Sequence, residues 1–126
     1  QRQMCIRDRV GDLWDVTLLE AEIGQYSMKF AFRLGDEYTD DIDFTEKTGW
    51  SPTPASIRLK DGTDIRPYGN GGGSWDADSH TYTCIKHTLN MVLDPEQIAG
   101  VSFYNGSELN DQGKRVSKPY YYIPFE

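Results

Sequence analysis

One stretch of this chain alternates strictly between large apolar side chains and polar or small ones. Residues 26–34 read Tyr-Ser-Met-Lys-Phe-Ala-Phe-Arg-Leu, with the large apolar groups on every second position. This spacing places them on one face of a strand, whereas a helix would scatter them around its circumference. We therefore predict a half-buried β-strand over residues 26–34.

The same period of two recurs in shorter stretches. It predicts further strands over residues 14–18, 56–60, 63–66, 81–93, 101–104 and 120–125. Asp61-Gly62, between two of these stretches, is typical of a type I′ hairpin turn, because that turn needs positive φ at both central residues. Residues 68–79, which are glycine-rich from Gly69 to Ser74, are predicted to form a loop.

One short segment favours a helical turn. Asp94 suits the N-cap, Pro95 suits the first helical position, and Gly100 could end the turn in a left-handed conformation. About seven strands joined by turns predict an all-β fold, an antiparallel β-sandwich that is Ig-like or related. We expect one short helical turn in it, near residues 94–99.

The charge of the chain limits its partners. The formal net charge is −7 and the basic residues are scattered, which argues against nucleic acid and against docking on an anionic membrane surface. No apolar run approaches the ~20 residues of a membrane-spanning helix, and no secretory signal is present. The sequence therefore carries no targeting information of its own.

The first nine residues differ in character from the rest. Residues 1–9 read Gln-Arg-Gln-Met-Cys-Ile-Arg-Asp-Arg and show no periodicity. Codon by codon, the stretch resembles a translated transposase adapter of the kind joined to fragments in sequencing libraries. We interpret residues 1–9 as an adapter-derived segment, with a disordered native terminus as the alternative. Residues 10–126 are then a single β-sandwich domain, and native sequence would continue upstream.

No pattern in the sequence indicates catalysis or metal binding. His80, Cys84 and His87 are close in sequence, but 80 and 84 share one strand face while 87 lies on the other. A zinc site would also need a fourth ligand, so Cys84 is predicted to be a buried strand residue. The acidic run over residues 36–46 lacks the glycine of an EF-hand loop and is predicted to be solvated. We expect no cofactor, no metal and no enzymatic activity.

Three aromatic residues are candidates for ligand binding. Tyr68 and Trp75 flank the glycine-rich stretch, and Trp50 lies between a glycine and Pro52. Loop aromatics can stack on sugar rings or anchor a protein partner. The alternative for the tryptophans is that their rings fold back onto the core.

Several short motifs together resemble a known family. In order along the chain they are Leu59-Lys60-Asp61-Gly62-Thr63, the glycine-rich stretch, residues 93–101 and the ending Ile123-Pro124-Phe125. The same motifs occur in the same order in that family. The chain resembles the C-terminal extracytoplasmic domain of a Gram-positive family of membrane-anchored, anti-sigma-factor-like proteins of unknown function. The resemblance implies a β-sandwich held outside the membrane by one upstream helix, and it implies no catalytic residues. The segment 110–118 departs from the compact ending of that family.

These observations lead to one expected function and two alternatives. We expect a non-enzymatic extracytoplasmic sensor or interaction domain that binds an envelope ligand or protein and contacts the membrane only through an upstream helix. The first alternative is a carbohydrate or cell-wall binding module that uses Trp50, Tyr68 and Trp75. The second is a structural adhesin or spacer domain.

Overall fold

A computed structural model describes residues 2–10, 16–35, 54–69, 71–88, 91–104, 107–117 and 119–125. Within these ranges the chain forms eleven strands and one 3-10 turn. They are β1 (Arg2–Arg9), β2 (Val16–Ile23), β3 (Ser27–Leu34), β4 (Pro54–Leu59), β5 (Asp64–Ile65), β6 (Gly71–Asp76), β7 (Thr81–His87), η1 (Pro95–Gln97), β8 (Ile98–Phe103), β9 (Ser107–Leu109), β10 (Arg115–Ser117) and β11 (Tyr121–Pro124).

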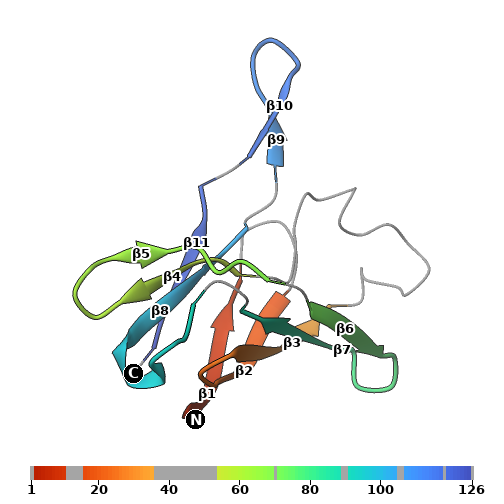
Figure 1. Ribbon diagram of the computed structural model, residues 1–126. Helices are drawn as coiled ribbons and strands as arrows, with labels where there is room; N and C mark the ends of the chain where they lie inside the picture. The colour runs from red at the N-terminus through yellow and green to blue at the C-terminus, as the bar shows by residue number, and fades with distance from the viewer. Residues whose placement is uncertain are drawn as a thin grey trace.

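The strands form two large antiparallel sheets and a separate hairpin. The five-stranded sheet has the order β1-β2-β3-β7-β6, the four-stranded sheet has the order β11-β8-β4-β5, and β9 pairs only with β10. In Figure 1 the β9–β10 hairpin projects away from the two large sheets. The predicted all-β antiparallel sandwich is confirmed, although it has more strands than expected.

The core forms where the alternating side chains of the two sheets meet. The predicted strand over residues 26–34 is confirmed as β3, and four of its large apolar side chains are buried: Met28, Phe30, Phe32 and Leu34. Tyr26, which the prediction placed on the same face, precedes β3 and is 62% exposed. Phe103 of β8 lies edge-on to two of them, with its ring centroid 5.4 Å from the centroid of Phe30 and 5.4 Å from that of Phe32. Phe103 therefore joins the four-stranded sheet to the five-stranded one.

The first residues of the chain lie along β2 as an edge strand. β1 pairs antiparallel with β2, and the register shifts between Cys5 and Asp8. The Nη1 atom of Arg2 donates hydrogen bonds to the carbonyl oxygens of Pro95 (3.1 Å) and Ile98 (3.0 Å). Arg2 thus ties β1 to the start of β8. The adapter origin of this segment concerns the gene and stays a prediction.

The glycine-rich stretch forms a strand, so the prediction of a loop there was wrong. β6 pairs with β7 along its whole length without a bulge. A Cβ atom at Gly71 would collide with the carbonyl oxygen of Ile85, and one at Gly73 would collide with the Tyr82 hydroxyl. The backbone of β7 therefore requires glycine at position 71, whereas a larger residue at position 73 would displace the Tyr82 side chain. Sequence periodicity could not reveal this strand, because glycine has no side chain to show it.

β7 is shorter than the predicted strand over residues 81–93, and its phase differs. Cys84 is buried and lies opposite Phe30, which confirms the prediction of a buried strand cysteine. Ile85, which the period of two places in phase with Met91 and Leu93 of the predicted strand, is 40% exposed. His80 immediately before β7 has φ of 53°, in the left-handed region, and its carbonyl accepts a hydrogen bond from Leu34 N.

The predicted helical turn is confirmed, but its predicted ending is wrong. Asp94 is the N-cap of η1, and its carboxylate accepts a hydrogen bond from Glu96 N at 3.2 Å. The turn ends at Ile98 in an extended conformation, and Gly100 lies within β8. The reason for glycine at position 100 is therefore found in the sheet.

Some predicted features lie outside the described residues. They are Trp14 at the start of a predicted strand, the acidic run over residues 36–46, the binding candidate Trp50, and the dipeptide Asn105-Gly106, whose residue types are typical of a turn after the predicted strand over residues 101–104.

Candidate functional site

The outward face of the four-stranded sheet carries a group of tyrosines and arginines. Ile57, Val101 and Ile123 are buried and lie opposite one another on β4, β8 and β11. Because side chains alternate along a strand, their neighbours in sequence point to the opposite face. We call the outward group the Tyr–Arg face: Arg58, Arg66, Tyr104, Tyr120 and Tyr122.

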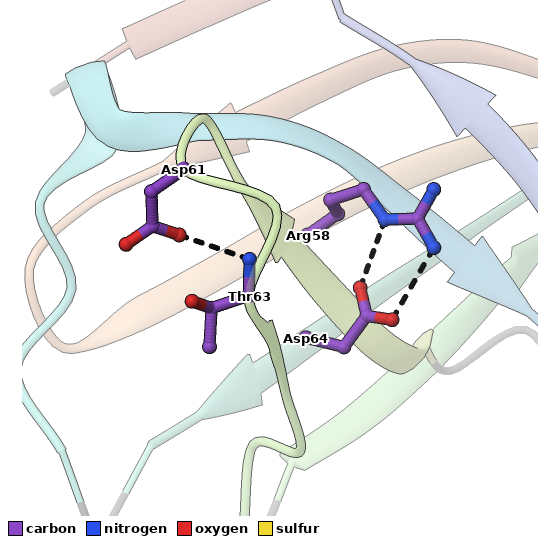
Figure 2. A network of polar contacts seen from close by, with 4 residues as sticks. All are labelled: Arg58, Asp61, Thr63 and Asp64. Atoms are coloured by element: carbon purple, nitrogen blue, oxygen red, sulfur yellow. Dashed lines mark hydrogen bonds and ion pairs between the residues drawn. The ribbon is translucent and has the colours of Figure 1, made fainter.

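Arg58 is held in position by a two-point ion pair. Its Nε and Nη2 atoms donate to the two carboxylate oxygens of Asp64 at 3.0 and 3.2 Å (Figure 2). The hydrogen bond with Arg58 lowers the pKa of the Asp64 carboxyl, and the same bond raises the pKa of Arg58. Since both side chains are about half exposed, water and salt screen the attraction. The pair therefore orients Arg58 more than it stabilises the fold.

The β4–β5 turn that places Asp64 beside Arg58 differs from the predicted type. Gly62 has φ of 92°, but Asp61 has no positive φ, so the turn is not type I′. The Asp61 carboxylate accepts a hydrogen bond from Thr63 N at 2.9 Å, and this bond lowers the pKa of Asp61 (Figure 2). Leu59 N donates to Thr63 O across the turn. The predicted hairpin is therefore confirmed, with one left-handed residue instead of two.

Tyr122 and Arg58 meet above a glycine. The guanidinium carbon of Arg58 lies 4.8 Å from the ring centroid of Tyr122, within the range of a cation–π contact. Between their strands lies β8, whose outward residues Gly100 and Ser102 are small and buried. A Cβ atom at Gly100 would collide with the Tyr122 ring. Small residues on the middle strand thus let long side chains from both flanking strands lie across it.

The second half of the face is built around Tyr120. Its ring packs edge-on against Tyr104, with centroids 5.3 Å apart, and its hydroxyl accepts a hydrogen bond from Nη2 of Arg66 at 3.5 Å. Tyr120 is 40% exposed and Tyr104 37%. These rings remain available to a partner while their neighbours fix their orientation.

The chemistry of the Tyr–Arg face suits binding. Tyrosine and arginine are enriched at the energetic centres of protein interfaces, because they offer large contact area together with polar groups at the tip. Guanidinium groups also recognise carboxylates. In a chain with a net charge of −7, Arg66 adds a positive charge to this face beyond the Arg58–Asp64 ion pair, so the face is a local exception to the acidic surface.

The structure does not bring the three sequence-predicted binding residues together in the described part of the chain. Tyr68 follows β5 and is 70% exposed. Trp75 is partly buried on β6, packs against the core and contacts the His80 ring edge-on at 5.5 Å. Trp50 lies outside the described residues. The role of these three residues in binding stays a prediction.

The cysteine and histidines near β7 are also separated. Cys84 points into the core, and burial raises the pKa of its thiol to about 12. His87 is exposed, and His80 belongs to the turn before the strand. Among the residues that the structure describes, no group of three or more histidine, cysteine or acidic side chains could hold a metal ion.

We expect the two cysteines to differ sharply in reactivity. Cys5 is exposed and Cys84 is buried with a raised pKa, and only a thiolate reacts readily with disulfide reagents. One thiol per chain should therefore react with Ellman's reagent in the native protein and two in denaturant. In a Cys5→Ser variant the rapid native reaction should vanish. Two rapidly reacting thiols in the native chain would contradict the burial of Cys84.

Comparisons with models of protein families, with curated proteins and with solved structures found no match for this chain. In the ranges described above, no helix is long and apolar enough to cross a membrane.

Proposed function

We propose that this domain is a non-enzymatic interaction module that binds a protein partner through its Tyr–Arg face. The observation that carries the proposal is the pre-oriented set of rings and guanidinium groups on the four-stranded sheet, all of them exposed except the half-buried Tyr122. Side chains that are already held in place lose less conformational freedom when a partner binds.

The chemistry of the face suggests what the partner presents. Arg66 is exposed and uses a guanidinium N–H to contact Tyr120, so its remaining donors can meet a carboxylate. The tyrosine rings offer apolar contact area beside it. We propose that the partner segment combines acidic with apolar or aromatic residues.

The proposed setting is the extracytoplasmic side of a membrane-anchored, anti-sigma-like regulatory protein, in which the domain acts as a sensor. Its support is the family resemblance of the sequence motifs. The test is to recover the complete gene from the source genome. A membrane-spanning segment upstream of Val10 and a neighbouring sigma-factor gene are expected. A gene that starts just before Val10, without either, would remove this setting and leave the binding proposal untouched.

A second candidate function, carbohydrate binding, is favoured by the exposure of Tyr68. Its side chain is 70% exposed in the segment between β5 and β6, and an exposed aromatic ring can stack on a sugar. A screen against cell-wall glycans with Tyr68→Ala and Trp75→Ala variants separates the two candidates. Glycan binding that both variants abolish would support the carbohydrate module.

We expect the Tyr–Arg face to select peptides from a displayed random library. Tyr120→Ala and Arg66→Gln should each weaken binding of the selected peptides by about tenfold or more, as expected for central interface residues. The selected peptides should be rich in acidic and aromatic residues. Binding can be measured by biolayer interferometry.

The matched controls lie away from this face. Tyr26 is 62% exposed before β3, and Arg33 is exposed on β3. Tyr26→Ala and Arg33→Gln remove the same side-chain types and should leave binding within about twofold. Equal losses from the controls and the face variants would show that the binding depends on general surface properties, and would refute the proposed site.

A further inference from the structure

The edge of the five-stranded sheet at β6 differs from the other sheet edges described. An edge strand leaves every second N–H and C=O group unpaired and can pair with another strand, so proteins usually protect such edges. β1 has a register shift, β5 has two residues, and β11 ends in a proline. β6 has six residues, regular pairing, and neither lysine nor proline.

The glycines of β6 make this edge accessible. A Cβ atom at Gly71 would collide with the backbone of β7 and one at Gly73 with the Tyr82 side chain, but a Cβ atom at Gly72 would meet nothing within 4 Å. Packing within the chain therefore leaves room for a side chain at position 72, where the sequence has none. A run of three glycines followed by Ser74 lets a second strand approach without steric conflict from either face.

We propose that β6 pairs antiparallel with β6 of a second copy of this chain. The two copies are related by a two-fold axis perpendicular to the sheet, which keeps each side chain on the same face of the combined sheet. Such an axis passes between the two copies of one residue, and these two copies lie directly opposite each other. With Gly73 on the axis, Gly71 lies opposite Trp75 of the second copy and Gly72 lies opposite Ser74. The two five-stranded sheets then form one continuous sheet.

Trp75 makes this edge complementary to itself. It is the one large side chain of β6, and it shares a strand face with Gly71 and Gly73. With Gly73 on the axis, Trp75 lies opposite Gly71, over which only the backbone of β7 approaches, so no side chain obstructs the ring. Cross-strand aromatic–glycine pairs are a known means of stabilising edge glycines. This complementarity favours a second copy of the chain as the partner of the β6 edge.

The charge distribution shapes the expected affinity. Asp76, at the end of the strand, is the sole charged residue in β6, but each chain carries a net charge of −7. Two such chains repel each other at long range, and salt screens this repulsion. Since edge pairing buries a small area, we expect a weak dimer with a Kd on the order of 10–100 μM that tightens as ionic strength rises.

The first test is sedimentation velocity of the full chain over a range of concentrations. Dimer should form in the wild type, and Ser74→Lys should weaken dimerisation by about tenfold or more, because it places a lysine on the edge. Thr83→Lys is the matched control: Thr83 lies opposite Ser74 on the inner strand β7 and faces the same side of the sheet. A monomer at ~1 mM, tenfold above the expected Kd, would overturn the proposal.

A cross-linking experiment tests the register itself. In a Cys5→Ser background, Gly72→Cys and Ser74→Cys chains are prepared separately, oxidised alone and oxidised as a mixture. Residues directly opposite in an antiparallel pair are close enough for a disulfide, whereas residues on a diagonal are too far apart. We expect a covalent dimer in the mixture and little in either single sample. Equal cross-linking in all three samples would refute this pairing. The Tyr–Arg face lies on the four-stranded sheet and β6 on the five-stranded one. Pairing through β6 can therefore fail while partner binding at the Tyr–Arg face holds, and the reverse is also possible.

Discussion

Replacing Phe103 with alanine should destabilise the domain by about 3–5 kcal/mol, a large part of the ~5–15 kcal/mol that holds a domain of this size together. The Phe103 ring is fully buried and lies edge-on to both Phe30 and Phe32. Alanine removes these contacts and leaves a cavity between the two sheets, which rigid strands on both sides cannot close. Urea unfolding followed by tryptophan fluorescence and far-UV circular dichroism measures the loss.

Two further variants make this result specific. Phe103→Leu keeps most of the buried volume and should cost less than half as much as the alanine variant. Tyr104→Ala, one residue further along the chain, removes a ring from the exposed face and should cost about 1 kcal/mol or less. If Phe103→Ala cost no more than Tyr104→Ala, Phe103 would not join the two sheets as described.

The alternating residues of β3 show which part of the fold the sequence predicts well. A strand with one buried face must carry apolar side chains on every second position, and residues 28–34 do so without exception. The Asp61-Gly62 hairpin and the Asp94 cap were predictable for a similar reason. Their geometry depends on the backbone preferences of one or two residues.

β6 and β7 show where this reasoning fails. The β6 glycines have no side chains to alternate, and their place in the sheet rests on the pairing of β6 with β7. The period of two put Ile85 in phase with Met91 and Leu93 of one long predicted strand, but pairing with β3 puts Cys84 opposite Phe30 and turns Ile85 outward. In both cases the pairing with a neighbouring strand determines which residues form a strand and which side chains are buried. The local sequence does not show which strand that neighbour is.

The candidate site depends even more on strand order. Arg58 and Tyr122 lie far apart in the sequence and meet only because β8 lies between β4 and β11. The residues singled out from the sequence were aromatics near glycines, since loops often carry binding residues. One signal pointed to the Tyr–Arg face: with Ile123 in the core, the period of two turns Tyr120 and Tyr122 outward together.

The second large effect is expected at Gly100, the residue beneath the Tyr122 ring. A Cβ atom there would lie 2.5 Å from the carbonyl oxygen of Ile123 and would also collide with the ring. Gly100→Ala should therefore destabilise the domain by about 2–3 kcal/mol, although alanine is otherwise tolerated in strands. It should also weaken any binding at the Tyr–Arg face, because the ring must move away from Arg58. Gly72→Ala, where the added Cβ meets nothing, is the matched control and should cost about 0.5 kcal/mol or less.

A double-mutant cycle separates the two conflicts at Gly100. A ring can swing aside or be removed, but the Ile123 carbonyl belongs to the backbone of β11 and moves only if β11 shifts against β8. In a Tyr122→Ala background, Gly100→Ala should thus cost about 1 kcal/mol less than in the wild type without becoming neutral. The same cost in both backgrounds would place the whole conflict in the backbone. No cost in the Tyr122→Ala background would place it entirely in the ring, and glycine at position 100 would then serve the Tyr–Arg face alone.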